Sequence, residues 1–352
     1  MITLLRVNLD IKNGYKIAKS IRFHKAAEVI AKIAKKTNKL VIISHRDRPK
    51  GRDRKKSLLP LKVLLEKRLK RKIIFLSHFN FPRLKNQITE APHGSMLMLE
   101  NIRFLPGETK NDAKLAKNLA SLGDLFVNDD FATAHRKNAS TVGITKYIKS
   151  CMGPTFKAEI KALSKAITKP TKPFVLIIGG AKIEDKMSVI KNLYNKTTNI
   201  LLGGGPANTV LKASGLDIGS SIFEPHMLEL AKKLVQKKKI VLPVDWHWND
   251  SKILDIGKKT AENYVKTIKK AKTIIWSGPM GDIDTKRFSV GSNKVARTIA
   301  ASRGFSIVGG GDTTEVVIRL GLQKRFSFIS TGGGAMLEFL AGKRLPAIET
   351  LK

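Results

Sequence analysis

Residues 174–186 read FVLIIGGAKIEDK: an apolar run, then two glycines, then the charged start of a helical pattern. A run that is apolar throughout, rather than at alternate positions, is typical of a parallel strand covered on both faces. Glycine directly after such a strand lets the backbone approach a ligand at the start of the next helix. The stretch therefore predicts a β–loop–α unit with its loop at the carboxyl end of the strand.

The same alternation of apolar runs and helical patterns continues in both directions from this stretch. Strands are expected at 4–9, 40–43, 73–76, 96–99, 125–127, 174–178, 200–202, 240–242, 273–276, 305–308 and 326–329. Helices are expected at 26–36, 112–122, 157–167, 185–195, 227–237, 260–271 and 293–302. Repeated βαβ units predict an α/β fold with two doubly wound parallel sheets of five or six strands. The division is expected near residues 150–170, where proline-containing turns flank a candidate connecting helix.

The composition of the 352 residues suits a protein of the cytoplasm. Hydrophobic residues make up 42%, which is enough to form real cores. No apolar run reaches the roughly 18 residues that a membrane span needs, and the first residues do not resemble a signal peptide. The single cysteine, Cys151, excludes a disulfide framework and fits a reducing compartment. We expect no membrane partner.

The net charge of +38 is the most unusual feature of the composition. Between Arg46 and Lys72, 13 of 27 residues are Lys or Arg. However, the chain has no zinc-finger spacing and no basic zipper, and its 6% aromatic content offers few platforms for base stacking. We expect a lysine-rich solvated surface with non-specific attraction for polyanions, and no dedicated nucleic-acid partner.

Four glycine clusters follow predicted strands in the second half, at 179–180, 203–205, 309–311 and 332–334. Their N–H groups suit phosphate oxygens. Lys182 and Lys186 lie four residues apart on an opening helix and share a face, and Asp312 offers a carboxylate to a phosphate-bound Mg²⁺. Neither a Walker A motif nor a dinucleotide fingerprint is present, and residues 10–14 do not supply one after the first strand. This half is expected to bind a nucleotide, and a nicotinamide-dependent oxidoreductase is disfavoured.

Basic side chains follow the predicted strands of the first half. They occur in the segments 6–10, 44–49, 100–104 and 128–136. The carboxyl ends of parallel strands meet at one edge of a sheet, so these arginines and histidines are expected to converge. Arginine clusters suit phosphate or carboxylate groups, and the seven scattered histidines show no metal-ligand spacing. The pattern predicts a small anionic substrate.

Together these strings resemble phosphoglycerate kinase over nearly the whole chain. The most specific are residues 100–104 (ENIRF), 128–136, 179–186, 276–281 (WSGPMG), 309–313 (GGGDT) and 330–334 (STGGG). Four features resemble the archaeal branch of the family. They are Arg22-Phe23, the sequence Phe-Ala-Thr at 131–133, the C-terminal stretch and the compact length.

The resemblance implies two Rossmann-like domains joined by a hinge helix. Residues 1–155, with the C-terminal tail 336–352 returning to them, would bind 3-phosphoglycerate, and residues 156–335 would bind the nucleotide. The implied reaction is reversible phosphoryl transfer between 1,3-bisphosphoglycerate and ADP, giving 3-phosphoglycerate and ATP with Mg²⁺, by closure of the hinge. The sequence leaves open a monomer or a homodimer.

The resemblance also implies roles for individual residues. The substrate would be held by Asn8, Asp10, Arg22, His45, Arg48, Arg103, His135 and Arg136. The transferring phosphoryl group would meet Arg22, Lys182, Lys186 and the amides around Gly333. The nucleotide would contact Gly179, Gly180, Lys186, Gly203, Asp284, Gly309, Gly310, Gly311, Asp312 and Thr313, with Asp284 in place of the family's ribose-binding Glu and Asp312 holding Mg²⁺.

The sequence departs from the family pattern near the expected anion site. The family's Asp-x-Asn is reversed as Asn8-Leu9-Asp10, and Asp47 stands where the family has Gly. Both changes place an acid where it would repel the substrate. They keep an alternative open: a paralogue that retains the fold and binds RNA or another polyanion through its basic surface. Retention of Arg22, Lys182, Lys186 and Asp312 favours the enzyme.

Overall fold

The computed structural model describes residues 1–11 and 20–351, and the chain divides into two compact units. The first unit contains Met1–Glu159 and the segment from Arg344 onward, and the second contains Ile160–Lys343. Residues 12–14, part of the segment searched for a dinucleotide fingerprint, lie outside the described residues.

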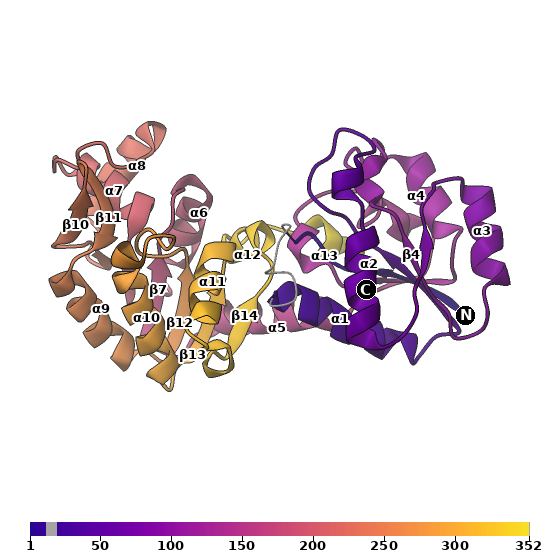
Figure 1. The fold of residues 1–352 in the computed structure, drawn as a ribbon. Coiled ribbons are helices and arrows are strands. Elements are labelled where there is room, and N and C mark those ends of the chain that lie inside the picture. Colours follow the sequence, from indigo (N-terminus) through magenta and orange to yellow (C-terminus); the bar gives the residue numbers. More distant parts are fainter. Residues whose placement is uncertain (12–19, 352) are drawn as a thin grey trace. The chain divides into compact units, whose positions relative to one another are not determined.

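The first unit is built on a six-stranded parallel sheet with the strand order β3-β4-β2-β1-β5-β6 (Figure 1). The strands are β1 (Ile2–Arg6), β2 (Lys39–Ile43), β3 (Ile74–Leu76), β4 (Met96–Leu99), β5 (Leu125–Asn128) and β6 (Ser150–Met152). The helices are α1 (Ile21–Ala34), α2 (Leu59–Leu69), α3 (Phe81–Glu90), α4 (Ala113–Ala120) and α13 (Pro346–Thr350). Leu5, Ile42 and Phe23 belong to one buried core that joins the sheet to α1.

The second unit repeats the architecture with the order β14-β13-β12-β7-β8-β9 (Figure 1). Its parallel strands are β7 (Phe174–Ile178), β8 (Asn199–Leu202), β9 (Ile240–Val241), β12 (Thr273–Ser277), β13 (Phe305–Gly309) and β14 (Phe328–Ser330). Its helices are α6 (Glu184–Leu193), α7 (Gly204–Ala213), α8 (Leu228–Val235), α9 (Lys258–Lys270), α10 (Val290–Ala301), α11 (Gly311–Arg319) and α12 (Gly334–Leu340). The antiparallel pair β10 (Trp246–Asn249) and β11 (Lys252–Ile256) forms a separate hairpin.

The predicted fold class is confirmed, because both sheets are parallel and have six strands. Individual elements differ from their predicted limits. β1 ends at Arg6 rather than Leu9, since the chain turns: Ile11 N donates to the Leu9 carbonyl (2.8 Å), and Leu9 N donates to Ser44 Oγ (3.0 Å). β6 occupies Ser150–Met152, where the sequence suggests only a turn. The turns that follow the strands carry the candidate site residues.

α5 (Pro154–Thr168) spans the division between Glu159 and Ile160. It starts three residues before the predicted 157, because proline fits the first helical turn and Asp129 caps the helix from β5. Asp129 Oδ1 accepts hydrogen bonds from Thr155 N (2.7 Å) and Phe156 N (3.1 Å). The helix expected to connect the domains is thus tied to the first sheet at its N-terminus.

The C-terminal segment returns to the first unit from Arg344, eight residues later than the predicted 336. Residues before Arg344 stay with the second unit because α12 packs against α6. Within the first unit, Ala347 N donates to the Ala134 carbonyl (3.1 Å) and so anchors α13. In the described part of the chain, no helix is long and apolar enough to cross a membrane.

Candidate functional site

The adjacent strands β4, β2, β1 and β5 bring the basic residues of the first unit to one edge of the sheet. Arg6 ends β1 and pairs in register with Asn128, the last residue of β5. His45 follows β2 by two residues, and Arg103 follows β4 within a short 3₁₀ turn. The predicted convergence of these segments is therefore present in the fold.

Arg6 is fully buried at the centre of this edge; the sequence analysis expected it among the converging basic residues but assigned it no contact with the substrate. Its Nη1 lies 3.0 Å from Asp130 Oδ2, and its Nε donates to Ser140 Oγ (3.0 Å). Its Nη2 donates to His45 Nδ1 (2.8 Å). Ser140 Oγ in turn donates to Glu108 Oε1 (2.6 Å). Because these donors are directed to protein groups, Arg6 holds Asp130, Ser140 and His45 in place at the edge of the sheet.

His45 is held as a neutral imidazole. Burial lowers its pKa well below the ordinary value, and the positive charges of Arg6, Arg103, Arg22 and Arg136 lower that pKa further. A guanidinium can only donate, so Nδ1 of His45 is the acceptor and Nε2 carries the proton. Nε2 lies 3.7 Å from Asp10 Oδ2. The ring therefore presents an N–H group at the edge where the arginines gather.

Asn8 and Asp10 are engaged within the protein. Asn8 Nδ2 donates to Asp130 Oδ1 (2.8 Å), and its Oδ1 accepts from Asp10 N (3.0 Å). Asp10 Oδ1 accepts from Asp47 N (2.8 Å), and the Asp10 carbonyl accepts a hydrogen bond from Arg22 Nη1. Asp10 thus connects the loops around it, and it contacts both His45 and Arg22.

The pKa of Arg103 shows how closely the positive charges are gathered at this edge. Its pKa is lowered to about 10, mainly by burial and then by the positive charges of Arg6 and Arg136, while Asp10 and Asp130 oppose the shift. Its Nη1 donates to the Asp47 carbonyl (2.6 Å). Guanidinium groups that repel one another at short range form a site that an anion would stabilise.

Three of the predicted substrate-binding residues line one open cleft of about 690 Å³, namely Arg48, Arg103 and Arg136. Arg48 is exposed, whereas Arg136 is half-buried and donates from Nε to His135 Nε2 (3.1 Å). Asn8, Asp10, Arg22, His45 and His135 lie outside the lining of this cleft. The structure therefore divides the predicted set into three arginines that line the cleft and five residues outside its lining, of which His45 is buried and the other four are half-buried.

In the second unit, glycine loops pack directly on one another. Gly180 N donates to the Pro279 carbonyl (2.7 Å), and Gly204 N donates to the Met280 carbonyl (3.0 Å). Gly179 needs to be glycine because a side chain there would collide with the Pro279 backbone. Gly179 and Gly203 are buried by this packing, while Gly180 and Gly204 face a pocket.

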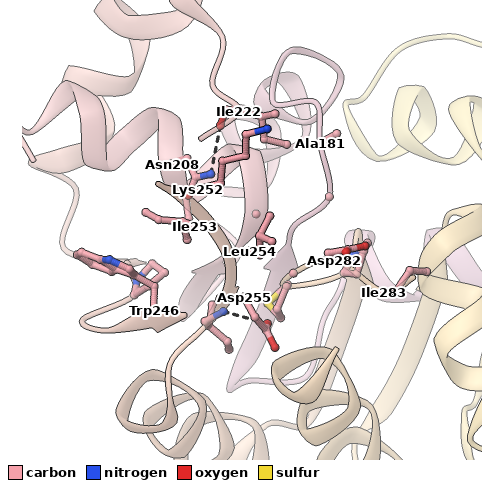
Figure 2. Close-up of a pocket in the computed structure, with 18 of the residues that line it drawn as sticks. Ala181, Asn208, Ile222, Trp246, Lys252, Ile253, Leu254, Asp255, Asp282 and Ile283 are labelled. Atoms are coloured by element: carbon pink, nitrogen blue, oxygen red, sulfur yellow. Dashed lines mark hydrogen bonds between the residues drawn. The ribbon is translucent and has the colours of Figure 1, made fainter. Parts of the chain in front are cut away.

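That pocket has a volume of about 330 Å³ and is shown in Figure 2. One wall is held by Asn208, whose Nδ2 donates to the Ile222 carbonyl (3.2 Å). Apolar side chains dominate the lining: Ala181, Ala207, Leu211, Ile222, Pro243, Trp246, Ile253, Leu254, Ile256, Pro279, Met280 and Ile283. The acids are Asp255, Asp282, Asp284, Asp312 and Glu315, with the cation Lys252. A mostly apolar slot with a few polar groups suits a flat organic ring system.

The predicted nucleotide residues are distributed around this pocket. Asp284 and Asp312 line it and are exposed, and Asp312 lies in the first turn of α11. Thr313 is buried, and its Oγ1 accepts from Gly278 N (2.7 Å), so it connects α11 to the 278–281 loop. Gly309 ends β13, Gly310 precedes α11 with φ of 100°, and Gly311 is its first residue. Gly333 precedes α12 with φ of 53°.

Lys182 and Lys186 have different environments despite their spacing. Lys186 is buried on α6, and its Nζ donates to the Lys182 carbonyl (2.8 Å). The Lys186 ammonium also lies beside Gly180, where it is the nearest neighbour to the position of a Cβ. Lys182 is exposed just before α6, and neither lysine lines the pocket.

Asp255 is a pocket residue that the sequence analysis missed. The pKa of its carboxyl is raised to about 7, mainly by burial and to a smaller extent by nearby Asp282, while backbone N–H groups oppose the shift. Those donors include Gly291 N at 2.8 Å and Ile256 N at 2.9 Å. The Asp255-Ile256-Gly257 sequence shows no pattern that signals burial of the carboxylate.

The donor set fits a Mg²⁺ ion that is held mostly by phosphate oxygens. Within residues 1–11 and 20–351, no group of three or more His, Cys, Asp or Glu side chains could hold a metal ion by itself. Mg²⁺ in phosphoryl-transfer sites is commonly bound through one or two carboxylates together with substrate phosphates and water. The exposed carboxylate of Asp312 on the pocket wall meets that requirement.

Comparison with known proteins adds an independent observation. The family model described as "Phosphoglycerate kinase" matches residues 2–343. The phosphoglycerate kinase of Dictyoglomus turgidum is 41% identical over 376 aligned positions, covering 99% of this chain and 95% of that protein. The one from Pseudothermotoga lettingae is 40% identical with the same coverage.

Two solved structures agree with the whole fold. The phosphoglycerate kinase of Coxiella burnetii superposes with a TM-score of 0.85 at 35% identity, and that of Pyrococcus horikoshii superposes with a TM-score of 0.88 at 29% identity. Each match covers 99% of this chain and 95% of the solved one. The bacterial relatives at 40–41% identity do not support the resemblance to the archaeal branch.

Proposed function

The chain belongs to the phosphoglycerate kinase family, which transfers a phosphoryl group to a carboxyl-group acceptor, and from this premise we propose a role for the arginine edge of the first unit and for the pocket of the second. The first unit would hold 3-phosphoglycerate, and the second would hold ADP or ATP. A substrate that carries a carboxylate and a phosphate needs cationic partners for both groups, and the arginines at this edge of the sheet supply them.

 The convergence of Arg22, Arg103 and Arg136 around a neutral His45 is the observation that carries this assignment.

Within the first unit, the arginines of the cleft and His45 would bind different parts of the substrate. Arg103 and Arg136 would bind the charged ends of the glycerate, and the Nε2–H of His45 would donate a hydrogen bond to it. The acids at positions 10 and 47 repel the substrate less than the sequence alone suggests. Asp10 accepts hydrogen bonds, and the Asp47 carboxylate lies 2.5 Å from Lys56 Nζ.

Arg22 is our choice for the transferring phosphoryl group. Its Nη1 is tied to the Asp10 carbonyl, and its charge reaches His45 strongly enough to lower the pKa of that ring. It is thereby positioned next to the histidine and the loop that follows β1. Phosphoryl transfer depends mainly on positioning and charge stabilisation, so an arginine placed in this way suits the reaction.

The second unit would bind the nucleotide in the 330 Å³ pocket, with the base against the apolar lining and the phosphates near the glycine loops. The buried ammonium of Lys186, beside Gly180, would stabilise negative charge on the phosphates, and Lys182 and the Gly333 amide would assist it. Asp312 would hold Mg²⁺, which when bound neutralises phosphate charge.

An acyl phosphate is already a reactive donor, so the reaction needs no strong general base. The neutral state of His45 agrees with this requirement, because the ring serves as a hydrogen-bond donor and need not take a proton. The two substrates must meet for in-line transfer, and we propose that α5, which spans the division at Glu159, acts as the hinge.

The direct test is turnover of 3-phosphoglycerate and Mg-ATP, coupled to reduction of the bisphosphate product by its dehydrogenase. Arg103→Met should raise KM for 3-phosphoglycerate by at least about 10-fold with little change in KM for ATP, as expected for loss of a charged hydrogen bond. Lys186→Met should impair the use of the nucleotide, because it removes the ammonium proposed to stabilise charge on the phosphates. Lys258→Met, exposed on α9, is the matched control. Absence of turnover from folded protein that binds ADP would contradict the proposal.

Three further statements belong to the proposal. A cytoplasmic location is supported by the single cysteine, since the chain has no second thiol for an intramolecular disulfide. The use of ATP/ADP with Mg²⁺ is supported by family membership. A monomer or a homodimer, and descent from the archaeal branch, stay predictions from the sequence.

A further inference from the structure

The 690 Å³ cleft of the first unit is lined by cations and by no carboxylate. Its described lining consists of Arg48, Pro49, Lys50, Gly51, Arg103, Phe104, Leu105, Pro106, Thr109, Lys110, Arg136, Lys137 and Asn138. Arg48, Arg103 and Arg136 belong to the proposed substrate site, but Lys50, Lys110 and Lys137 have no role there. The cleft therefore extends the positive wall beyond the groups that the glycerate would use.

Two buried donors in the lining lack hydrogen-bond acceptors among the described residues. These are Arg103 Nε and Asn138 Nδ2, whose residues are only 6% and 3% exposed. A buried donor without an acceptor has lost its hydrogen bonds to water without replacing them, which destabilises the folded state. A ligand rich in acceptor oxygens would satisfy both donors and the surrounding charge at once.

The size of the cleft also exceeds what a three-carbon acid needs. Pockets of about 300–1,000 Å³ usually hold drug-sized ligands, and 690 Å³ lies well inside that range. The three additional lysines are exposed, so they are accessible to a flexible ligand. The cleft thus has room and countercharge for several phosphate groups in a row.

The lining favours inorganic phosphate chains over RNA. Single-stranded nucleic acid binding commonly combines cations with exposed aromatic rings on which bases stack. Phe104 is the aromatic residue in the described lining, and it is 7% exposed. The cleft therefore offers charge and hydrogen-bond donors without a stacking surface.

We propose that this cleft binds a linear polyphosphate and that the bound chain excludes 3-phosphoglycerate. Exclusion follows because Arg103 and Arg136 are shared between the cleft and the proposed substrate site, so this part of the inference rests on the proposed function. The chain would extend from these arginines towards Lys50, Lys110 and Lys137.

The probe is sodium tripolyphosphate, and the protein is the full chain. Calorimetry in Mg²⁺-free buffer measures binding directly, and the coupled assay at saturating ATP with Mg²⁺ in excess measures inhibition. We expect inhibition that is competitive with 3-phosphoglycerate and weakens with added salt, since exposed charges are screened within about 10 Å at 0.1 M ionic strength. Inhibition that is competitive only with ATP would overturn the proposal.

The variant Lys50→Gln/Lys110→Gln/Lys137→Gln removes the additional cations. Its matched control is Lys35→Gln/Lys36→Gln/Lys114→Gln, three exposed lysines of the same unit outside the cleft, which changes net charge equally. The cleft variant should weaken tripolyphosphate binding about 10-fold or more, because each exposed cation contributes part of the attraction, with turnover retained. The control should change binding less than about twofold.

Equal weakening in both variants would show a general effect of net charge and would overturn the proposal. Equally tight, cleft-dependent binding of a uridine oligonucleotide would overturn the preference for polyphosphate. If the wild type lacks kinase turnover but still binds tripolyphosphate through the three lysines, the proposed function fails while the cleft assignment stands.

Discussion

Arg6 Nη2 donates a 2.8 Å hydrogen bond to His45 Nδ1, and this bond determines which ring nitrogen of His45 carries the proton. The same guanidinium lies 3.0 Å from Asp130 through Nη1, with both side chains fully buried. One residue at the end of β1 therefore neutralises a buried acid and orients the histidine of the substrate edge. Its burial makes both effects strong, because water does not screen them.

We predict that Arg6→Met destabilises the first unit by about 3–5 kcal/mol, because it leaves Asp130 as a buried charge without its cation. Chemical denaturation followed by far-UV circular dichroism measures the loss. Arg83→Met, exposed on α3, is the control and should change stability by less than about 0.5 kcal/mol.

The second unit provides an internal reference for this experiment. All three tryptophans, Trp246, Trp248 and Trp276, lie in it, so tryptophan fluorescence reports its unfolding. Adding Asp130→Asn to Arg6→Met should recover part of the lost stability. No recovery would show that packing of the Arg6 side chain, rather than the ion pair, dominates.

Asp47 links two site residues through its backbone in a left-handed conformation, with φ of 56°. Its N–H donates to Asp10 and its carbonyl accepts from Arg103, while its side chain is 41% exposed beside Lys56. We predict that Asp47→Gly lowers KM for 3-phosphoglycerate about threefold, since a repelling charge worth less than about 1 kcal/mol is removed and the backbone conformation is retained.

Asp47→Ala separates charge from conformation at this position. It removes the same carboxylate but, unlike Asp47→Gly, keeps a Cβ in the left-handed region, which costs about 1–2 kcal/mol relative to glycine. KM should fall as in Asp47→Gly, whereas stability should be lower. Glu90→Gln, exposed at the end of α3, controls for net charge. An unchanged KM in both Asp47 variants would show that Lys56 already cancels the repulsion.

Asp255 should make the stability of the second unit pH-dependent. Its folded pKa of about 7 lies above the ordinary 3.8, so the native state holds the proton to higher pH than the unfolded state does. Its contribution to stability is therefore present at low pH and decreases between about pH 4 and 7, by up to about 1.4 kcal/mol per pH unit. Asp255→Asn removes this titration.

The measurement is denaturation of wild type and Asp255→Asn from pH 4.5 to 8, followed by tryptophan fluorescence. The stability of the variant relative to the wild type should rise with pH up to about 7 and then level off. Ser292→Ala, a buried non-titrating change on α10 that removes the acceptor of Met280 N, should produce an offset that does not vary with pH. A constant offset for Asp255→Asn would contradict the assignment.

The sequence predicts the elements of the fold where burial alone determines the pattern of apolar residues. β7 is apolar at every position because helices cover both faces of its sheet, and the sequence shows it directly. The hairpin β10–β11 was missed, because Trp246–Asn249 is half-exposed and shows no apolar run. Its turn residues Asp250 and Ser251 have positive φ, but Asp-Ser is a weak signal compared with Asp-Gly.

The candidate site could be predicted from the sequence to a similar extent as the fold. Parallel strands end at a common edge, so the positions of His45 and Arg103 follow from the strands that precede them. Burial of Arg6 does not follow, because it depends on Asp130 and Ser140, which are more than 120 residues away in sequence. The local sequence pattern predicts that an arginine lies on the surface, because the partners that allow its burial are brought together only by the tertiary fold.

Arg22 is the residue whose removal should affect turnover far more than substrate binding. Arginines that stabilise a transferring phosphoryl group contribute about 10³–10⁵ in kcat, and the remaining arginines of the edge would still hold the glycerate. We therefore predict that Arg22→Ala lowers kcat by about 10³-fold or more and changes the Kd for 3-phosphoglycerate, measured by calorimetry, less than about threefold. Arg22→Lys should recover part of kcat, because a point charge replaces the planar fork.

Arg83→Ala on α3 serves as the control for loss of one arginine from the same unit. A fall in affinity for 3-phosphoglycerate that matches the fall in kcat/KM would place Arg22 among the ground-state binding residues, since an interaction made equally with substrate and transition state does not lower kcat. Near-normal turnover would remove it from the reaction. Only a loss of kcat at retained affinity agrees with a guanidinium whose main partner is the phosphoryl group in transit.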